Sequence, residues 1–125
     1  MDNNAIENEI QAKGLTAPRI TPADIEANIA NEFYFTAEEG ATEAWSRRPG
    51  PGRAYLADPP NMDALKLLTF CVLVLKNGFT VTGESACASP ENFDAEIGKK
   101  IARQNAIAKV WPLMGYELRS KLAAA

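Results

Sequence analysis

The strongest hydrophobic pattern lies in the middle of the chain, where two strand-like segments flank Asn77-Gly78. Asn-Gly is the strongest two-residue signal for a β-hairpin turn, and a two-residue turn fixes the pairing register. In that register Val74 lies opposite Val81. The predicted core face comprises Leu68, Phe70, Val72, Val74, Phe79 and Val81. The other face, which mixes polar and apolar side chains, comprises Cys71, Leu73, Leu75, Thr80, Thr82 and Glu84.

A helix is predicted before the hairpin. Thr21 is a suitable N-cap, Pro22 occupies the first helical position, and Asp24 stands where a capping box is completed. Ile25 and Ile29 give this helix an apolar stripe on one side. We therefore expect an amphipathic helix that begins at Pro22 and packs inward.

Three other segments before the hairpin are less regular. Residues 1–19 are polar, and we expect a partly flexible segment that holds at most a short helix. Residues 32–36 (EFYFT) are either a short aromatic strand or the end of the preceding helix. Residues 47–60 are rich in proline and glycine, which neither a helix nor a sheet interior tolerates at that density. This last segment is predicted to be a long loop.

A long helix is predicted after the hairpin, with Ser89 as its cap and Pro90 at its first position. Pro112 is expected to end or kink it, because proline lacks the N–H that would bond to the carbonyl four residues earlier. A last helix would follow in residues 112–125 and bury Leu113, Met114 and Leu118. The buried stripe of the long helix is expected to comprise Phe93, Ile97, Ile101, Ile107, Ala108 and Trp111.

These elements predict one α+β domain over residues 1–125, in which an N-terminal helix and two C-terminal helices pack on an antiparallel hairpin or small sheet. A sheet of two or three strands is marginal alone, and its mixed face and open edge need a cover. We expect a second copy of the chain to provide that cover, so the protein is predicted to be oligomeric.

Composition narrows the function. The chain has 125 residues, a net charge of −3 and no histidine. An acidic balance disfavours a DNA-binding protein, and the lack of histidine removes the commonest nucleophile–base and zinc arrangements. Two cysteines cannot form a four-ligand metal site. The acidic N-terminus is unlike a signal peptide, and the longest apolar run, Leu67–Leu75, is too short to span a membrane. We expect a cytoplasmic protein that is not an enzyme and has no metal or other cofactor.

Charge is segregated along the chain. Residues 1–45 hold nine acidic and two basic side chains, whereas residues 96–121 hold six basic and two acidic ones. Lys99 and Arg103 are four residues apart and therefore share one helix face. This face is either a solvated surface that balances the acidic half, or a clamp for a phosphate-bearing ligand in which Arg103 binds through two parallel hydrogen bonds.

Other polar residues have two interpretations each. Asn92 either satisfies a free amide at the helix start or offers its own amide to a base or ribose. Asn105 is either a polar residue buried in an interface or a ligand contact. The basic cluster Arg47, Arg48 and Arg53 is either solvated or part of a loop that closes over a ligand. No spacing of carboxylates indicates acid–base catalysis.

Three segments carry a resemblance to known proteins, namely NGFTVTGESAC (77–87), ENFDAEIGKKIARQNA (91–106) and WPLMGYELRSKL (111–122). They resemble a family of small phage and prophage proteins that includes the anti-Thoeris sponges called Thoeris anti-defence one. The resemblance implies a catalytically inert protein that binds a cyclic ADP-ribose isomer, the Thoeris immune signal, in a bacterial host cell. It also implies dimers that assemble into hexamers, with pockets at subunit contacts, and for some members a second site for CBASS cyclic di- or trinucleotides.

The resemblance also implies a ligand-binding set, namely Phe79, Thr82, Asn92, Lys99, Arg103 and Asn105. Lys99 and Arg103 would neutralise the diphosphate, and Phe79 or Tyr34 would stack on the adenine. Lys99 stands where the family pattern has arginine, which keeps the charge but loses the planar fork. The alternatives are an enzyme that cleaves the signal, disfavoured by the lack of histidine, and a non-catalytic phage structural or partner-binding oligomer.

Overall fold

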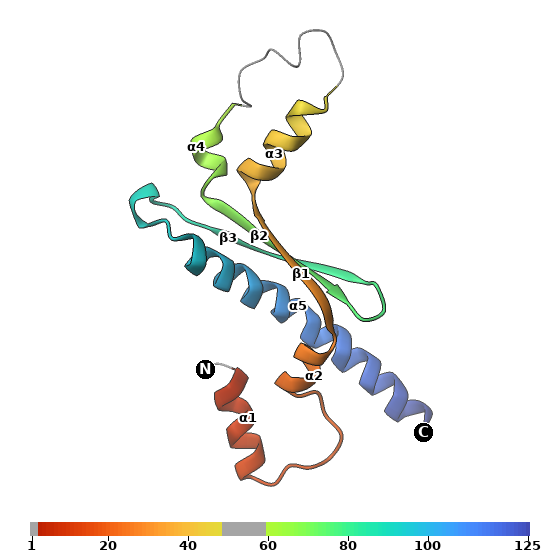
Figure 1. The fold of residues 1–125 in the computed structure, drawn as a ribbon. Helices are drawn as coiled ribbons and strands as arrows, with labels where there is room; N and C mark the ends of the chain where they lie inside the picture. Colours follow the sequence, from red (N-terminus) through yellow and green to blue (C-terminus); the bar gives the residue numbers. More distant parts are fainter. Residues whose placement is uncertain (1–2, 49–59) are drawn as a thin grey trace.

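The computed structural model describes residues 3–48 and 60–125, and its fold is α+β as predicted (Figure 1). Three antiparallel strands form one sheet in the order β1-β2-β3. The long helix α5 crosses one face of the sheet, with α1 and α2 near one end of the sheet and α3 and α4 near the other (Figure 1). The elements are α1 (Asn3–Ala12), α2 (Pro22–Ala27), β1 (Ile29–Thr36), α3 (Ala37–Ser46), α4 (Met62–Leu65), β2 (Leu68–Leu75), β3 (Thr80–Ala86), the 3-10 turn η2 (Pro90–Asn92) and α5 (Ala95–Ala124).

The hairpin forms where predicted, but its register is one residue away from the predicted one. Val74 pairs with Thr80 rather than with Val81, and the N–H of Leu75 donates to the carbonyl of Phe79 over 2.8 Å. The loop therefore has three residues, and its last residue, Gly78, has a φ of +88°. A three-residue loop needs a left-handed residue at that position, and an Asn-Gly pair supplies one as readily as it supplies a two-residue turn.

The two faces of β2 are exchanged relative to the prediction, whereas on β3 Val81 is buried as predicted. On β2 the buried side chains are Thr69, Cys71, Leu73 and Leu75, which are the alternate residues to the predicted core set. Of that predicted set, Val81 alone is buried, because the shifted register places it beside Leu73. Successive side chains of a strand point to opposite faces, so predicting the wrong core face for β2 misplaces every side chain of that strand.

Helix α5 selects this face because its backbone comes very close to β3 at Gly83. A Cβ atom on Gly83 would lie 2.1 Å from the carbonyl oxygen of Ala102 and 2.3 Å from the nitrogen of Ala106. Only a glycine allows a helix backbone to approach that closely. The core that results contains Ile25, Cys71, Leu73, Leu75, Val81, Ala102, Ala106 and Val110.

The predicted start of α5 was wrong, and its predicted buried stripe was only partly right. The helix begins at Ala95, with the Asp94 side chain accepting from the N–H of Ile97 over 3.0 Å. Pro90 begins η2 instead, and Ser89 precedes that turn. Its buried stripe is Gly98, Ala102, Ala106 and Val110, a run of small residues at every fourth position. The larger Ile97 and Ile101 of the predicted stripe are 55% and 42% exposed, whereas its members Ile107 and Trp111 are half-buried and pack against the core. Small side chains are buried because the helix lies so close to the sheet.

The two predicted C-terminal helices are one helix of 30 residues that continues through Pro112. Pro112 and Ala108, the residue four positions earlier, both lie on the exposed side of α5. Water can therefore bond to the Ala108 carbonyl that lacks its helical N–H partner, which lowers the cost of the proline.

The segments before the hairpin follow the local signals. Thr21 and Asp24 form the reciprocal hydrogen bonds of a capping box, so the predicted start of α2 is confirmed. Residues 32–36 lie in β1, which confirms the strand interpretation. A second capping box, between Thr36 and Glu39, begins α3, a helix that the hydrophobic pattern did not reveal. The predicted loop at 47–60 falls largely outside the described residues.

Among the residues that the structure describes, no helix lies along most of the face of the sheet opposite α5 (Figure 1). That face carries apolar side chains. Phe33 is 55% exposed and Phe35 is 38% exposed, and the rings of Phe35 and Phe70 lie 5.5 Å apart. The cross-strand register places Phe33 beside Val72, and Val72 beside Thr82. We call this surface, formed by Phe33, Phe35, Phe70, Val72, Val74 and Thr82, the open sheet face.

Candidate functional site

Arg103 lies at the centre of the densest charged cluster that the described residues contain. Two parallel hydrogen bonds of 2.9 and 2.7 Å join its guanidinium to the Glu26 carboxylate, at the end of α2. Its Nε and Nη2 also donate to Glu32 of β1, over 3.3 and 3.2 Å. The other Glu32 oxygen accepts from the Tyr34 hydroxyl over 2.9 Å. The cluster thus ties α5 to both α2 and β1.

The same contacts shift the pKa values of the cluster. Hydrogen bonding to Arg103 lowers the pKa of Glu26, and the bonds to Glu26 and Glu32 raise the pKa of Arg103. Burial raises the pKa of Tyr34, and its hydrogen bond to Glu32 adds to that shift. Burial also raises the pKa of Cys71, the neighbour of Tyr34 across the strands. One cation faces two carboxylates, so the cluster carries a net charge of −1.

The basic helix face predicted from the sequence is present, and its members are engaged with acids of the same chain. Lys99 lies 3.7 Å from Glu96 on its own helix. Both ion-pair partners of Arg103, Glu26 and Glu32, belong to the acidic N-terminal half of the chain. The amide nitrogen of Asn105 donates to the Glu84 carbonyl over 2.7 Å and thereby joins α5 to β3. These contacts agree with the interpretation in which the basic face balances the acidic half.

The remaining members of the predicted ligand set lie elsewhere. Phe79 follows the hairpin turn and is 56% exposed, beside a small hollow of about 240 Å³. Thr82 lies on the open sheet face, and Asn92 ends η2 with its side chain exposed. Thr82 and Arg103 are therefore on opposite sides of the sheet. Within one chain the predicted residues do not converge on one pocket.

The second predicted basic cluster is only partly described. Arg47 pairs with Glu43 one turn earlier in α3, over 2.6 Å. The Arg48 guanidinium stacks over the ring of Trp45 at 4.1 Å from its centroid. Arg53 lies outside the described residues.

A groove runs beside the Arg103 cluster, between α1, α2 and α5. One part has a volume of about 520 Å³ and is bordered by Arg103, Glu26, Gln104 and the N-terminal amides of α1. A second part, of about 260 Å³, is largely apolar. Trp111 borders both parts, as do Asn3 and Pro22. The apolar part is bordered by Ile6, Ile10, Ile20, Pro22 and Trp111, with Asn3, Glu7 and Arg19 at its rim.

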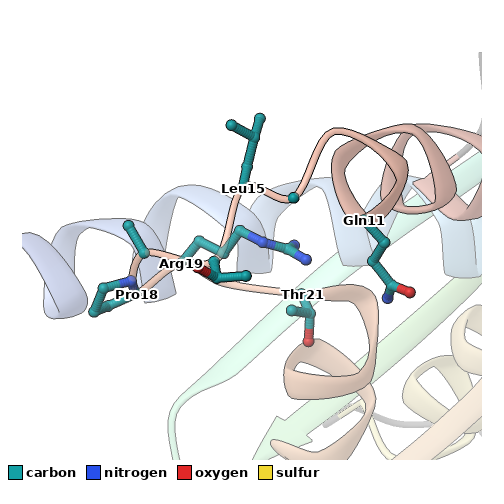
Figure 2. Close-up of a pocket in the computed structure, with 8 residues that line it drawn as sticks. Gln11, Leu15, Pro18, Arg19 and Thr21 are labelled. Carbon is teal, nitrogen blue, oxygen red and sulfur yellow. The ribbon is translucent and has the colours of Figure 1, made fainter.

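Another hollow, of about 520 Å³, lies in the connection between α1 and α2 (Figure 2). Leu15 and Pro18 are among the residues that line it, and Arg19 extends toward α1 (Figure 2). Both terminal nitrogens of Arg19 donate to Glu7, over 2.5 and 2.7 Å. The one cation at this hollow is thus already neutralised, and the hollow offers no further charged group to a ligand.

Sequence reasoning missed the partners of Arg103. Glu26 and Glu32 lie on either side of the junction between α2 and β1, where no single periodicity connects them. The segregation of acidic and basic residues between the two halves was the only signal that they would meet. The sequence pattern also did not indicate the groove at Trp111, because three separate helices border it.

Two absences hold for residues 3–48 and 60–125. They contain no group of three or more acidic or cysteine side chains that could hold a metal ion. They also contain no helix that is both long and apolar enough to cross a membrane.

The chain was compared with protein-family models, curated proteins and solved structures. The model of a family described as "Phage protein (N4 Gp49/phage Sf6 gene 66) family" matches residues 20–122, which include the whole sheet and most of α5. No curated protein and no solved structure matches the chain.

Proposed function

Because the chain belongs to the N4 Gp49/phage Sf6 gene 66 family of phage proteins, we propose that it is a non-catalytic phage protein that sequesters an immune signal of the cyclic ADP-ribose type. On this proposal it acts in the cytoplasm of the bacterial host, needs no cofactor, and leaves its ligand chemically intact. Cyclic di- and trinucleotides are a second class of ligand that the protein would sequester on this proposal.

The observation that carries the proposal is the position of Arg103 at the edge of the groove. Its guanidinium presents the planar fork that binds phosphate oxygens in pairs. The chain has no histidine, and its described residues hold no metal-ligand group. A site with a phosphate-binding cation and without these catalytic groups favours binding over turnover.

The ligand has to exchange with a carboxylate, because Glu26 already occupies the Arg103 fork. The side chain of Glu26 is 53% exposed, so it returns to water at low cost when it is released. Glu32 is less exposed, at 37%, and also holds the Tyr34 hydroxyl. Glu26 is therefore the partner that a phosphate would displace, while Glu32 stays in place.

The direct test is recovery of the bound molecule. The protein is incubated with cyclic ADP-ribose isomers, separated from free nucleotide and denatured by heat, and the released material is identified by mass spectrometry. A sequestering protein returns the isomer intact, and a cleaving enzyme returns products. If the protein never depletes free cyclic ADP-ribose, the proposal is wrong.

Point variants locate the anion site. Arg103→Ala should weaken binding by about 2–4 kcal/mol in calorimetry, because a charge-assisted contact is lost. Glu26→Gln should strengthen binding, because it removes the competing carboxylate. Arg119→Ala is the matched control, since Arg119 is an exposed arginine on the same helix. Equal affinities for all four proteins would exclude Arg103 from the site.

A second candidate function, a phage structural or partner-binding oligomer, is favoured by the open sheet face. Exposed phenylalanines on a sheet are unusual in a chain that works alone. We propose that a second copy covers this face, giving a dimer that can assemble further into a hexamer. Light scattering should show a mass above 13.5 kDa for the wild type and a lower mass for Phe33→Ser with Phe35→Ser. A monomeric wild type at micromolar concentration would refute this self-association.

A further inference from the structure

The Arg103 guanidinium donates from two edges, and each edge faces a different carboxylate. The end of the fork, formed by Nη1 and Nη2, donates to Glu26 over 2.9 and 2.7 Å. The side of the fork, formed by Nε and Nη2, donates to one oxygen of Glu32 over 3.3 and 3.2 Å. Release of Glu26 therefore frees the end of the fork while the side stays held. A group held along one side keeps its direction when its other contact is lost.

Glu32 is itself held in place on β1. Its other carboxylate oxygen accepts from the Tyr34 hydroxyl over 2.9 Å. The two residues are two positions apart on the strand, so their side chains share a face. The Tyr34 ring is half-buried and packs against the core, and burial raises the pKa of its hydroxyl, which therefore remains a donor at neutral pH. A continuous series of contacts thus leads from the core through Tyr34 and Glu32 to Arg103.

A cation that is held before the ligand arrives binds it more tightly. A mobile arginine side chain loses rotamer freedom when it binds, and this loss lowers the affinity. Arg103 has already lost that freedom, because its ion pairs to α2 and β1 fix it from two elements. When a phosphate takes the place of Glu26, Glu32 still holds the guanidinium. The affinity should then depend on Glu32, although a carboxylate by itself repels an anion.

We propose that Glu32 and Tyr34 are positioning residues of the anion site: Tyr34 holds Glu32, and Glu32 holds the side of the Arg103 guanidinium so that the end of the fork faces the incoming phosphate. This inference rests on the proposed function, because the phosphate belongs to the nucleotide that the protein is proposed to sequester. Glu32 and Tyr34 do not touch that nucleotide, and they act on it only through Arg103. The charge of Glu32 and its hydrogen bond to Arg103 therefore have opposite effects on affinity.

Two substitutions of Glu32 separate the hydrogen bond from the charge. Glu32→Gln and Glu32→Ala both remove the negative charge, but only glutamine keeps an oxygen that can accept from Arg103. In calorimetry with cyclic ADP-ribose, Glu32→Ala should bind about tenfold more weakly than Glu32→Gln, which is the usual effect of losing a hydrogen bond to a charged group. If Glu32 acted through its charge alone, the two variants would bind equally well, and both would bind more tightly than the wild type.

Tyr34→Phe tests the second contact without any change of charge. It removes the hydroxyl that holds Glu32 and should weaken cyclic ADP-ribose binding by about threefold to tenfold. Tyr116→Phe is the matched control, because Tyr116 is a tyrosine of α5 that is 78% exposed. This control should bind cyclic ADP-ribose as the wild type does.

Arg103→Lys provides the background that tests the route of the effect. Lysine keeps the positive charge but has no planar fork for Glu32 to orient. In that background Tyr34→Phe should cause no further loss of affinity, because residues that act through one another are not additive. The same loss in both backgrounds would mean that the Tyr34 hydroxyl does not act through Arg103, and it would overturn the inference.

The outcomes distinguish this inference from the proposed function. If the wild type binds no cyclic ADP-ribose, or if binding does not depend on Arg103, both fail. If Arg103→Ala weakens binding, but Glu32→Ala equals Glu32→Gln and Tyr34→Phe equals the wild type, only this inference is overturned. Should Glu32→Ala not fold, as judged by circular dichroism, Tyr34→Phe in the two backgrounds decides, because phenylalanine keeps the packing of the ring.

Discussion

Replacing Gly83 by alanine should destabilise the fold severely, because this residue is where α5 touches the sheet. The added Cβ would lie 2.1 Å from the Ala102 oxygen, whereas ordinary contact begins at 3.4 Å. The helix backbone would have to move by the difference, about 1.3 Å. A gap of 0.5–1 Å already loses roughly a quarter to a half of a contact's dispersion energy, and this displacement affects the whole buried stripe.

We expect Gly83→Ala to lower the free energy of unfolding by about 3–4 kcal/mol, at or above the upper end of the usual cost of overpacking a core. That is a large part of the roughly 5–15 kcal/mol that a domain has. Urea denaturation followed by circular dichroism and tryptophan fluorescence measures it, provided that the slope with urea is unchanged.

Gly115→Ala is the matched control on α5. A Cβ there meets nothing within 4 Å, and alanine is a better helix former than glycine. This variant should therefore be more stable than the wild type by about 0.5–1 kcal/mol. If the free energy of unfolding of Gly83→Ala instead lies within about 0.5 kcal/mol of the wild-type value, the close approach of α5 to β3 is wrong.

Three further predictions concern local contacts. The pKa of Glu7 is lowered to about 2 by its hydrogen bonds from Arg19 and then Gln11. The stabilisation that ionised Glu7 contributes is therefore complete above the ordinary pKa of 4.5 and is lost as the pH falls through about 2. Carbon NMR of the Glu7 carboxyl should show the lowered pKa, and Arg19→Ala should return that pKa to the ordinary range. Thr36→Ala removes the cap of α3 and should cost about 1 kcal/mol in urea denaturation, and a loss near zero would refute that cap. With a thiol reagent under native conditions Cys87 should react before Cys71, which is fully buried and has a raised pKa; equal rates would refute the burial.

Much of the fold could be predicted from local signals. The capping box at Thr21, the strand at 32–36 and the hairpin at Asn77-Gly78 each depend on residues close together in sequence. The interactions that form these elements join residues only a few positions apart, so the local sequence pattern is enough to predict them. The start of α3 was equally local, in the Thr36–Glu39 capping box, and was overlooked because its apolar stripe is weak.

The face of the sheet that becomes the core could not be predicted in the same way. Both faces of β2 carry large apolar side chains, and α5 decides between them through Gly83, Ala102 and Ala106. Small residues do not stand out in a hydrophobic pattern, although here they form the closest contact. Loop length had the same ambiguity, since Asn77-Gly78 fits turns of two or three residues.

The candidate site was predictable in its central cation and not in its surroundings. Arg103 was identified from its spacing to Lys99, and the structure places it beside a groove. Its carboxylate partners come from two elements far away in sequence, Glu26 and Glu32. Such pairs depend on the tertiary fold, so sequence patterns indicate the charges but not their partners.

The distribution of side-chain size has a thermodynamic consequence. The fully buried side chains are mainly alanine, valine, leucine and cysteine, whereas several large ones, Phe33, Phe79, Ile97, Ile101 and Tyr116, are exposed. The free energy gained on folding one chain is then small for its length, and contact with a second copy would supply much of the additional stabilisation. Under the proposed self-association, folding and assembly form a single coupled equilibrium, and dilution alone would favour the unfolded chain.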